Sequence, residues 1–528
     1  MKPSFLTGVL VTPLILFALH SAQAATNPPS TNVAWLTAAT NPDIERAFAL
    51  ARRDHKPLLL YWGATWCPPC NQLKATFFNR HDFAAMSRSF VAVHVDGDRP
   101  GAQMLGARFK VSGYPTVVLF SALGAEITRL PGEVDAAQMM AVLQLGLSGG
   151  RPVKAVLADA RAGKTVTTND WRLLAFYSWD TDEQQLAPKA DLPALLAQLA
   201  LASPVADAEV TTRLWLKALA ASDEGKGVKP DAVLKVRVEQ VLADAAQSRL
   251  YGDVLTGGAT EIVRVLSSDD GADRAPLLAA FEASLKRLQA DVTLSRGDRV
   301  GALIARIALA RLGQAKDAVV VTMPEALLKD LREHVARADR EITDGYEREA
   351  VVSAAGYALS RAGLWDESYA LLTANLTRSQ SPYYLMSQLA GNARKLGKKE
   401  EALRWYGQAY EKSEGPATRL QWGAGYVGAL VDLSPGDAAR IEQTTAGLIS
   451  EAARDRGAFS GRSLRSLQRI STKLVSWNAD GKRAAALRRL QGQLAPVCAK
   501  AATAEGQRAS CQALLRPAAT TSVPAGKA

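Results

Sequence analysis

Cysteine is scarce in this chain, with only 4 among 528 residues. Small exported folds that depend on disulfides are far richer in cysteine, so a disulfide scaffold is excluded. The four fall into two local pairs, Cys67 with Cys70 and Cys498 with Cys511. One C-x-x-C supplies half of the ligands of a structural zinc site, and no second C-x-x-C or H-x-H accompanies it. We therefore expect no metal site.

Long apolar runs are absent beyond the N-terminus. Residues 1–24 combine Lys2, an apolar stretch from Phe5 to Leu19, and Ala22-Gln23-Ala24, which is the pattern of a cleaved secretory signal peptide. A retained membrane anchor is the alternative, but the run is short for spanning a bilayer and contains Pro13. The sequence predicts a soluble protein exported to a bacterial periplasm, without stable membrane insertion after signal cleavage.

Blocks of like charge are also missing. The 63 basic and 52 acidic residues are interleaved, so the net charge of +11 indicates a solvated surface. Nucleic acid is therefore not an expected partner, particularly in an exported compartment. A chain of this length exceeds a single hydrophobic core, and we expect at least two domains.

The stretch from Leu58 to Cys70 carries the clearest chemical signal. An apolar, strand-like run ends at Trp62 and is followed by a short turn and Cys67-Pro68-Pro69-Cys70. A C-x-x-C pair between a strand and a helix is typical of a dithiol redox site. The unpaired N–H groups and the dipole at a helix start stabilise a thiolate. Cys67 is then the attacking sulfur and Cys70 the resolving one.

The residues around this stretch predict an alternation of helices and strands. Apolar periodicity and turn residues predict helices over 43–54, 70–78, 103–109 and 135–147, and strands over 58–62, 90–95, 117–120 and 127–130.

The region from about Asn32 to Leu147 resembles the thioredoxin superfamily. The resemblance is carried by Trp66 with the C-x-x-C, by Gly-Tyr-Pro-Thr at 113–116, and by Gly132. Among exported members, it is similar to the periplasmic C-terminal domain of the transmembrane carrier of thiol-disulfide reductant. The resemblance implies an α/β domain over 32–148, with a central mixed sheet flanked by helices.

The same resemblance assigns roles to residues beside the dithiol. It implies that Pro115 is cis and faces the dithiol, and that the backbone of Tyr114 pairs with an incoming substrate strand. It also places Trp66 on the substrate-docking surface. The alternatives are a trans turn proline at Pro115 and a core aromatic at Trp66.

Two departures from the family concern proton transfer. Thioredoxins usually carry a buried acid where this chain has Tyr61, and a lysine where it has Ala92. Proton transfer at the resolving cysteine then needs water, the Tyr61 hydroxyl or another group. His94 and His81 are candidates, with a surface position as the alternative for each.

The residues between the cysteines bear on the redox potential. Pro68 and Pro69 have no N–H, so the Cys70 N–H is the nearest donor to the Cys67 sulfur. A less stabilised thiolate makes the disulfide a weaker oxidant, and we expect a potential nearer thioredoxin's roughly −270 mV than the roughly −120 mV of a strong oxidase.

Beyond a breaker cluster at 146–152 the sequence predicts a large all-α domain over 152–515. Gly363 and Gly397 lie 34 residues apart, which is the period of tetratricopeptide (TPR) helix pairs, and the TPR-like pattern is clearest over 346–415. Stacked helix pairs present a concave surface suited to gripping a partner. The alternative is a packed helical domain that only shields or positions the redox unit.

The second cysteine pair encloses a short loop near the C-terminus. In an oxidising compartment Cys498 and Cys511 are expected to form a structural disulfide. The alternative is a second redox pair that relays electrons to Cys67. The tail over 517–528, rich in Pro, Ala, Thr and Ser, is expected to be disordered.

Taken together, these patterns predict a periplasmic thiol-disulfide oxidoreductase that reduces substrate disulfides. Its only redox group would be the Cys67–Cys70 dithiol, with no further cofactor. The expected partners are a protein client and a membrane or soluble electron-donor protein, one of which the helical domain recruits. A thiol oxidase or isomerase with the same site is one alternative. A helical scaffold with an accessory thioredoxin-like docking domain is another.

Overall fold

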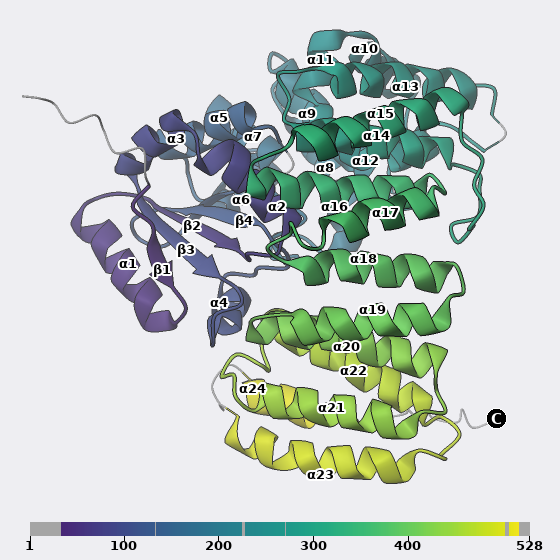
Figure 1. Ribbon diagram of the computed structural model, residues 1–528. Helices are drawn as coiled ribbons and strands as arrows, with labels where there is room; N and C mark the ends of the chain where they lie inside the picture. Colours follow the sequence, from purple (N-terminus) through teal and green to yellow (C-terminus); the bar gives the residue numbers. More distant parts are fainter. Residues whose placement is uncertain (1–32, 133, 224–226, 270, 502–505, 517–528) are drawn as a thin grey trace, which may run out of the picture.

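The computed structural model describes residues 33–132, 134–223, 227–269, 271–501 and 506–516. The predicted signal peptide over 1–24 and the predicted disordered tail over 517–528 lie outside the described residues. Two regions follow one another, a mixed α/β unit and a long array of helices (Figure 1). The predicted fold class is confirmed at this level.

A five-stranded sheet with the order β1-β3-β2-β4-β5 forms the centre of the α/β unit. β1, β3 and β2 are parallel, whereas β4 is antiparallel to β2 and β5 to β4. The strands are β1 (Leu36–Ala38), β2 (Leu58–Gly63), β3 (Val91–Asp96), β4 (Thr116–Phe120) and β5 (Glu126–Leu130).

Both faces of the sheet are covered, so its central strand β2 is buried along its whole length. Leu58, Leu60 and Trp62 pack with α1 (Asn41–Arg53) and α4 (Ala102–Arg108) on one face. Leu59 and Tyr61 point to the other face, because successive side chains alternate along a strand. The elements on that second face are α2 (Pro68–Leu73), the π-helical η1 (Lys74–Phe78), α3 (His81–Met86) and α5 (Ala136–Leu147).

The predicted order of elements is nearly complete, but it missed β1 and α3. β1 is a three-residue edge strand with one buried residue, so its sequence carries no alternation to detect. α3 is a short helix of six residues, which is continued by the 3-10 turn η2 (Ser87–Ser89). The predicted helix over 70–78 is divided into α2 and η1.

The second region is helical throughout its described part, apart from loops. Its elements are α6 (Val153–Arg161), α7 (Thr168–Phe176), η3 (Lys189–Asp191), α8 (Leu192–Ala202), α9 (Ala208–Ala220), α10 (Ala232–Ala243), α11 (Ala245–Leu250), α12 (Gly252–Leu266), α13 (Arg274–Ala290), α14 (Arg296–Ala310), α15 (Glu325–Glu341), α16 (Gly345–Arg361), α17 (Trp365–Asn375), α18 (Pro382–Lys395), α19 (Lys399–Lys412), α20 (Pro416–Leu433), α21 (Ala438–Ala452), α22 (Gly461–Trp477), α23 (Ala484–Lys500) and α24 (Gln507–Gln512).

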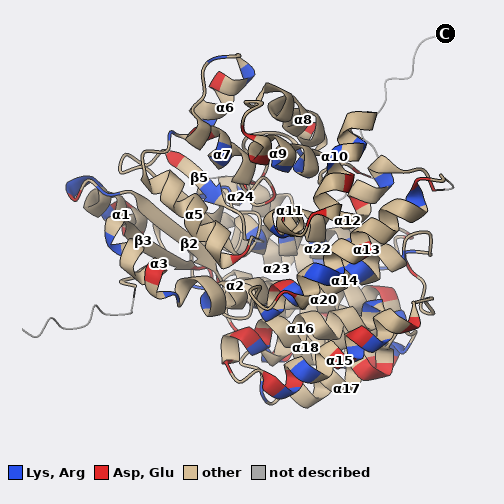
Figure 2. Cartoon of the chain, turned by 90° about the horizontal axis from the view of Figure 1, so that it is seen from above, with Lys and Arg blue, Asp and Glu red and all other residues tan. Residues whose placement is uncertain are grey.

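Neighbouring helices of this array pack against each other in sequence order, as α16 with α17 and α18 with α19 do. Gly363 and Gly397 occupy the two corresponding turns, both with positive φ. Only glycine adopts this conformation without strain, which explains why the two glycines recur at this spacing. Seen from above, acidic and basic residues intermingle over the helices (Figure 2).

The helical array touches the α/β unit in two different ways. Its first helices complete that unit, because Leu173 and Phe176 of α7 belong to the core beneath the sheet. Farther along, α16 packs against α2, and α22 packs against α4. The predicted boundary near 146–152 is a turn between α5 and α6, and the packing continues across it. Within the described residues, none of the helices has the length and apolar character needed to cross a bilayer.

Candidate redox site

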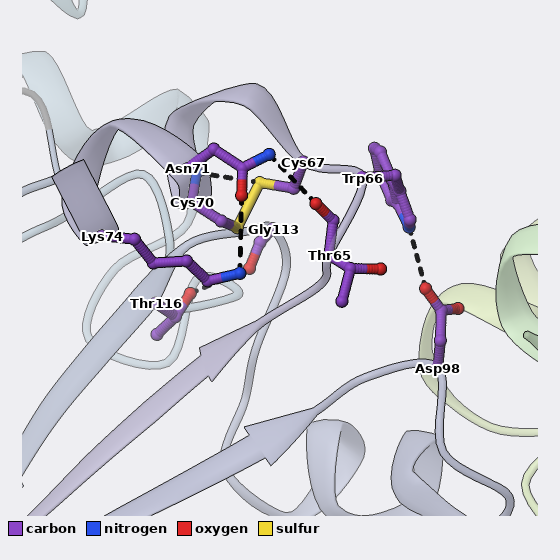
Figure 3. The surroundings of a disulfide bond; sticks show 9 residues. All are labelled: Thr65, Trp66, Cys67, Cys70, Asn71, Lys74, Asp98, Gly113 and Thr116. Carbon is purple, nitrogen blue, oxygen red and sulfur yellow. Dashed lines mark hydrogen bonds between the residues drawn. A yellow bond between two sulfur atoms is a disulfide. The ribbon is translucent and has the colours of Figure 1, made fainter. Parts of the chain in front are cut away.

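The first cysteine pair lies where the central strand gives way to a helix. Cys67 is the N-cap of α2 and is joined to Cys70 by a disulfide, with the two Cα atoms 5.2 Å apart. The Cys70 N–H donates to the Cys67 Sγ over 3.2 Å. This is the contact expected from the sequence, because Pro68 and Pro69 have no N–H to donate. The Asn71 side chain donates to the Thr65 carbonyl oxygen over 3.0 Å and fixes the turn (Figure 3).

The loop before β4 lies beside this turn. The Tyr114–Pro115 peptide bond is cis, as predicted. Tyr114 packs against the same apolar cluster as Cys67, Cys70 and Trp66. Its hydroxyl accepts from the Gln103 side chain over 2.8 Å. The structure therefore brings together four of the predicted site residues, Trp66, Cys67, Cys70 and Tyr114, and Pro115 directly follows Tyr114 in the chain.

Beneath the dithiol, the place of the usual buried acid is filled by Tyr61. Its ring stacks on His94 of β3 with 4.9 Å between centroids, and its buried hydroxyl has no hydrogen-bond partner among the described residues. Burial raises the pKa of Tyr61, with a further contribution from Asp96. Burial, reinforced by Lys74 and Arg99, lowers the pKa of His94 to about 4. Both side chains are therefore neutral near neutral pH.

Lys74 is a member of this group that the sequence analysis missed. It lies four residues after Cys70, and its ammonium group donates to the Asn71 side-chain oxygen over 3.4 Å (Figure 3). Burial lowers the pKa of Lys74, although Asp96 opposes that shift. The i+4 spacing after the second cysteine was the only sequence signal that could have indicated it.

Both cysteines are buried under the helical array. Cys67 is 2% exposed and Cys70 is 0% exposed. The residues that pack with them come largely from α17, α18 and α19, namely Leu372, Tyr383, Leu385, Met386, Leu389, Ala390, Trp405 and Ala409. The helical array therefore covers both sulfur atoms, which is the arrangement that a shielding role for the helical domain would require.

Trp66 is enclosed by the same array. Its ring stacks on Tyr384 at 5.9 Å and meets Trp422 edge-on at 6.0 Å. The Arg462 guanidinium lies 4.6 Å from the centre of the Trp66 ring. The Trp66 side-chain N–H donates to Asp98 Oδ2 over 2.8 Å (Figure 3). The surface that the family resemblance assigns to substrate docking is thus an internal contact here.

A cavity of about 490 Å³ remains between the two regions. Pro68, Pro69 and Gly132 form its wall on the α/β side, and residues of α12, α14, α16 and α18 form the opposite wall. Neither Cys67 nor Cys70 is among the residues that line it. The cavity therefore reaches the prolines of the motif but not its sulfur atoms.

The second cysteine pair is bonded as expected. Cys498 of α23 and Cys511 of α24 form a disulfide with Cα atoms 5.4 Å apart. Both lie in the core formed by α20 to α24, which is a different cluster from the one around Cys67. In the part of the chain that the structure describes, no group of three or more His, Cys, Asp or Glu side chains could hold a metal ion.

Comparison with known proteins supports the α/β unit as a family member. Residues 44–146 match the family model of the thioredoxin-like domain. The chain is 31% identical over 114 residues to the thiol:disulfide interchange protein DsbD 1 of Pseudomonas aeruginosa, covering 21% of this chain and 19% of that protein. It is 30% identical over 133 residues to DsbD of Vibrio vulnificus strain YJ016, covering 24% and 21%. The chain thus spans about a fifth of the length of these relatives.

Proposed function

Because residues 44–146 form a thioredoxin-like domain similar to part of thiol:disulfide interchange proteins, we propose that this chain is a thiol-disulfide oxidoreductase that reduces disulfides of a protein client. One observation carries the proposal: the Cys67–Cys70 disulfide lies at the start of helix α2 and packs with Trp66 and Tyr114. We further propose a periplasmic location, based on the signal pattern over 1–24.

The covalent steps take place at the sulfur atoms of Cys67 and Cys70. In the reduced protein, the Cys67 thiolate attacks a client disulfide, so that one client sulfur leaves as a thiolate and a mixed disulfide forms. Cys70 then transfers its proton through water to the client thiolate released in the first step, and its own thiolate attacks the Cys67 Sγ. This step releases the second client sulfur and leaves the Cys67–Cys70 disulfide. Two electrons pass to the client, and an electron-donor protein must then supply two electrons, with two protons from water, to convert the Cys67–Cys70 disulfide back to the dithiol.

The direction of electron flow is inferred from the residues between the cysteines. A helix start normally offers several N–H groups to the thiolate, but Pro68 and Pro69 remove two of them, and Cys70 supplies the contact that remains. A less stabilised thiolate shifts the equilibrium toward the disulfide form. The dithiol then gives up its electrons more readily and acts as a reductant. Oxidase or isomerase activity at the same site is the alternative within this class.

The experiment compares the mature full chain with Cys67→Ser in the reduction of insulin disulfides, with dithiothreitol supplied to regenerate the dithiol. We expect the wild-type chain to accelerate the reaction and Cys67→Ser to abolish the acceleration. Cys498→Ser with Cys511→Ser is the matched control and should retain activity. Loss of activity in that control, with a urea unfolding midpoint equal to that of the wild type, would favour the electron-relay alternative for the second pair.

A second candidate function is favoured by the burial of both sulfurs. In this alternative, the helical array, with its TPR-like pairs over 346–415, binds a partner and the thioredoxin-like domain is only a docking unit. Equal activity of wild type and Cys67→Ser in the insulin assay, together with unchanged biological function of Cys67→Ser, would support this scaffold and reject the oxidoreductase.

A further inference from the structure

The client surface of the thioredoxin-like domain is already occupied by another part of the same chain. Trp66 and Tyr114, to which a client would dock, contact the Arg462 guanidinium at 4.6 Å and 5.1 Å from their ring centres. Tyr384 and Trp422 fill the remaining space over Trp66. A client strand cannot reach Tyr114 while these side chains are in place.

The contact is anchored by buried hydrogen bonds to the loop after β3. We call the group formed by Asp98, Thr418 and Arg462 the Asp98 latch. The Thr418 N–H donates to Asp98 Oδ1 over 2.9 Å, and the Thr418 hydroxyl donates to Oδ2 over 2.6 Å. The Arg462 guanidinium adds an ion pair at 3.7 Å, with side chains only about a tenth exposed. Hydrogen bonds to a carboxylate, such as the two that Thr418 donates to Asp98, are among the stronger ones in proteins.

Two further contacts hold the end of this loop and the start of α4. The Gly101 N–H donates to Asp455 Oδ1 over 2.8 Å, and the Arg462 N–H donates to the Gln103 side-chain oxygen over 2.8 Å. The backbones approach closely at this point. A Cβ added to Gly415 would lie 2.6 Å from the Asp98 Cβ, and one added to Gly461 would lie 2.8 Å from Gln103 Oε1. The two surfaces are therefore fitted to each other rather than loosely apposed.

Exchange at a disulfide requires a thiolate to approach the sulfur along an open path. Cys67 is almost fully buried, and the neighbouring cavity is lined by the motif's prolines without its cysteines. We propose that the helical domain competes with the client for the surface formed by Trp66 and Tyr114. The client and the electron donor then reach Cys67 only after the face formed by α18, α20 and α22 separates from Trp66. This inference rests on the proposed function for its biological meaning.

The first helices of the array do not take part in this separation. The Ser178 N–H donates to the Arg129 carbonyl oxygen over 3.0 Å, and the Tyr177 hydroxyl donates to Glu126 Oε1 over 3.0 Å. With Leu173 and Phe176 in the core beneath the sheet, α7 moves with the thioredoxin-like domain. The opening therefore lies within the array, between α7 and α18, rather than at the turn over 148–152.

The test measures how fast dithiothreitol reduces the Cys67–Cys70 disulfide in the full oxidised chain. One dithiothreitol is oxidised to its cyclic disulfide, and its two electrons and two protons convert the bond into two thiols. Samples are quenched with acid, alkylated with N-ethylmaleimide and analysed by mass spectrometry of the Cys67 peptide. The variant Thr418→Val with Arg462→Met removes latch contacts without altering the thioredoxin-like domain.

We expect the latch variant to be reduced about tenfold faster than the wild type, which corresponds to about 1.4 kcal/mol. The matched control, Thr373→Val with Arg489→Met, removes a hydroxyl that bonds within α17 and an exposed ion pair between α23 and Glu442. This control should react at the wild-type rate. Equal rates for all three proteins would overturn the proposal.

A second measurement does not depend on any variant. The wild-type disulfide should be reduced at least about tenfold more slowly in the native chain than in urea-unfolded chain. A native rate as fast as the unfolded one would also overturn the proposal. If the latch variant is reduced rapidly but does not accelerate insulin reduction, the proposed function is rejected, whereas the proposal that the helical domain covers the client surface still stands.

Discussion

The ring of His94 lies flat against Tyr61, and its other neighbours are Trp35, Lys74 and Arg99. Burial beside two cations makes protonation of this histidine costly, and its folded pKa is about 4 against about 6.5 for an ordinary histidine. The unfolded chain therefore binds the proton more tightly than the folded chain between these two pH values.

The thioredoxin-like domain should accordingly lose stability on acidification. As the pH falls from 6.5 through 4, His94 costs up to about 3 kcal/mol of unfolding free energy. In His94→Gln we expect a weaker pH dependence of the urea midpoint in this range. At about pH 8 histidine is neutral in both the folded and the unfolded chain. The difference in urea midpoint between wild type and variant at this pH therefore measures the packing lost by the substitution. An unchanged pH dependence would show that His94 is solvated rather than buried.

Some residue-level features could be predicted from the sequence because they are local. The contact of the Cys70 N–H with the Cys67 Sγ spans three residues and follows from the two prolines between them. Asp98 and Arg462 were not predictable, because 364 positions separate them in the chain and no short motif links them. The same reason applies to Tyr384 and Trp422 over Trp66.

At the scale of elements, strong periodicity predicted the strands and helices of the thioredoxin-like domain. The edge strand β1 gave no such signal, and the division of the predicted 70–78 helix into α2 and η1 depends on packing beneath the sheet. In the helical array, the turns at Gly363 and Gly397 could be predicted because both positions have positive φ, which glycine adopts most readily. The identification of these helix pairs as TPR-like stays a prediction.

Glycines at the turn and within the preceding helix should respond oppositely to the same substitution. Gly397 has φ +73°, so Gly397→Ala should lower the unfolding free energy by about 1 kcal/mol. Gly391 lies inside α18 with no atom near its missing Cβ, so Gly391→Ala should raise it by up to about 1 kcal/mol. Urea unfolding of the two variants measures this difference. Equal effects would contradict the assigned turn.

At the scale of the whole molecule, the helical array packs against the domain that carries the dithiol. The sequence predicted that the helical array has a surface for binding a partner. In the structure, part of this array packs against Trp66 of the same chain. Sequence patterns could not reveal this arrangement, because each helix has the same apolar periodicity whether its neighbour is a helix or a different domain. The buried dithiol is the consequence that most affects function.

The Cys67–Cys70 pair is proposed to exchange electrons as a reductant. The most direct test equilibrates the full chain in thiol-disulfide buffers of graded potential, with time enough for the latch to open, and measures alkylation of Cys67 by mass spectrometry. We predict half-reduction nearer −270 mV than −120 mV, with Cys498 and Cys511 still bonded at that point. A midpoint above about −150 mV, or a Cys67–Cys70 bond that resists reduction until the chain unfolds, would contradict the account.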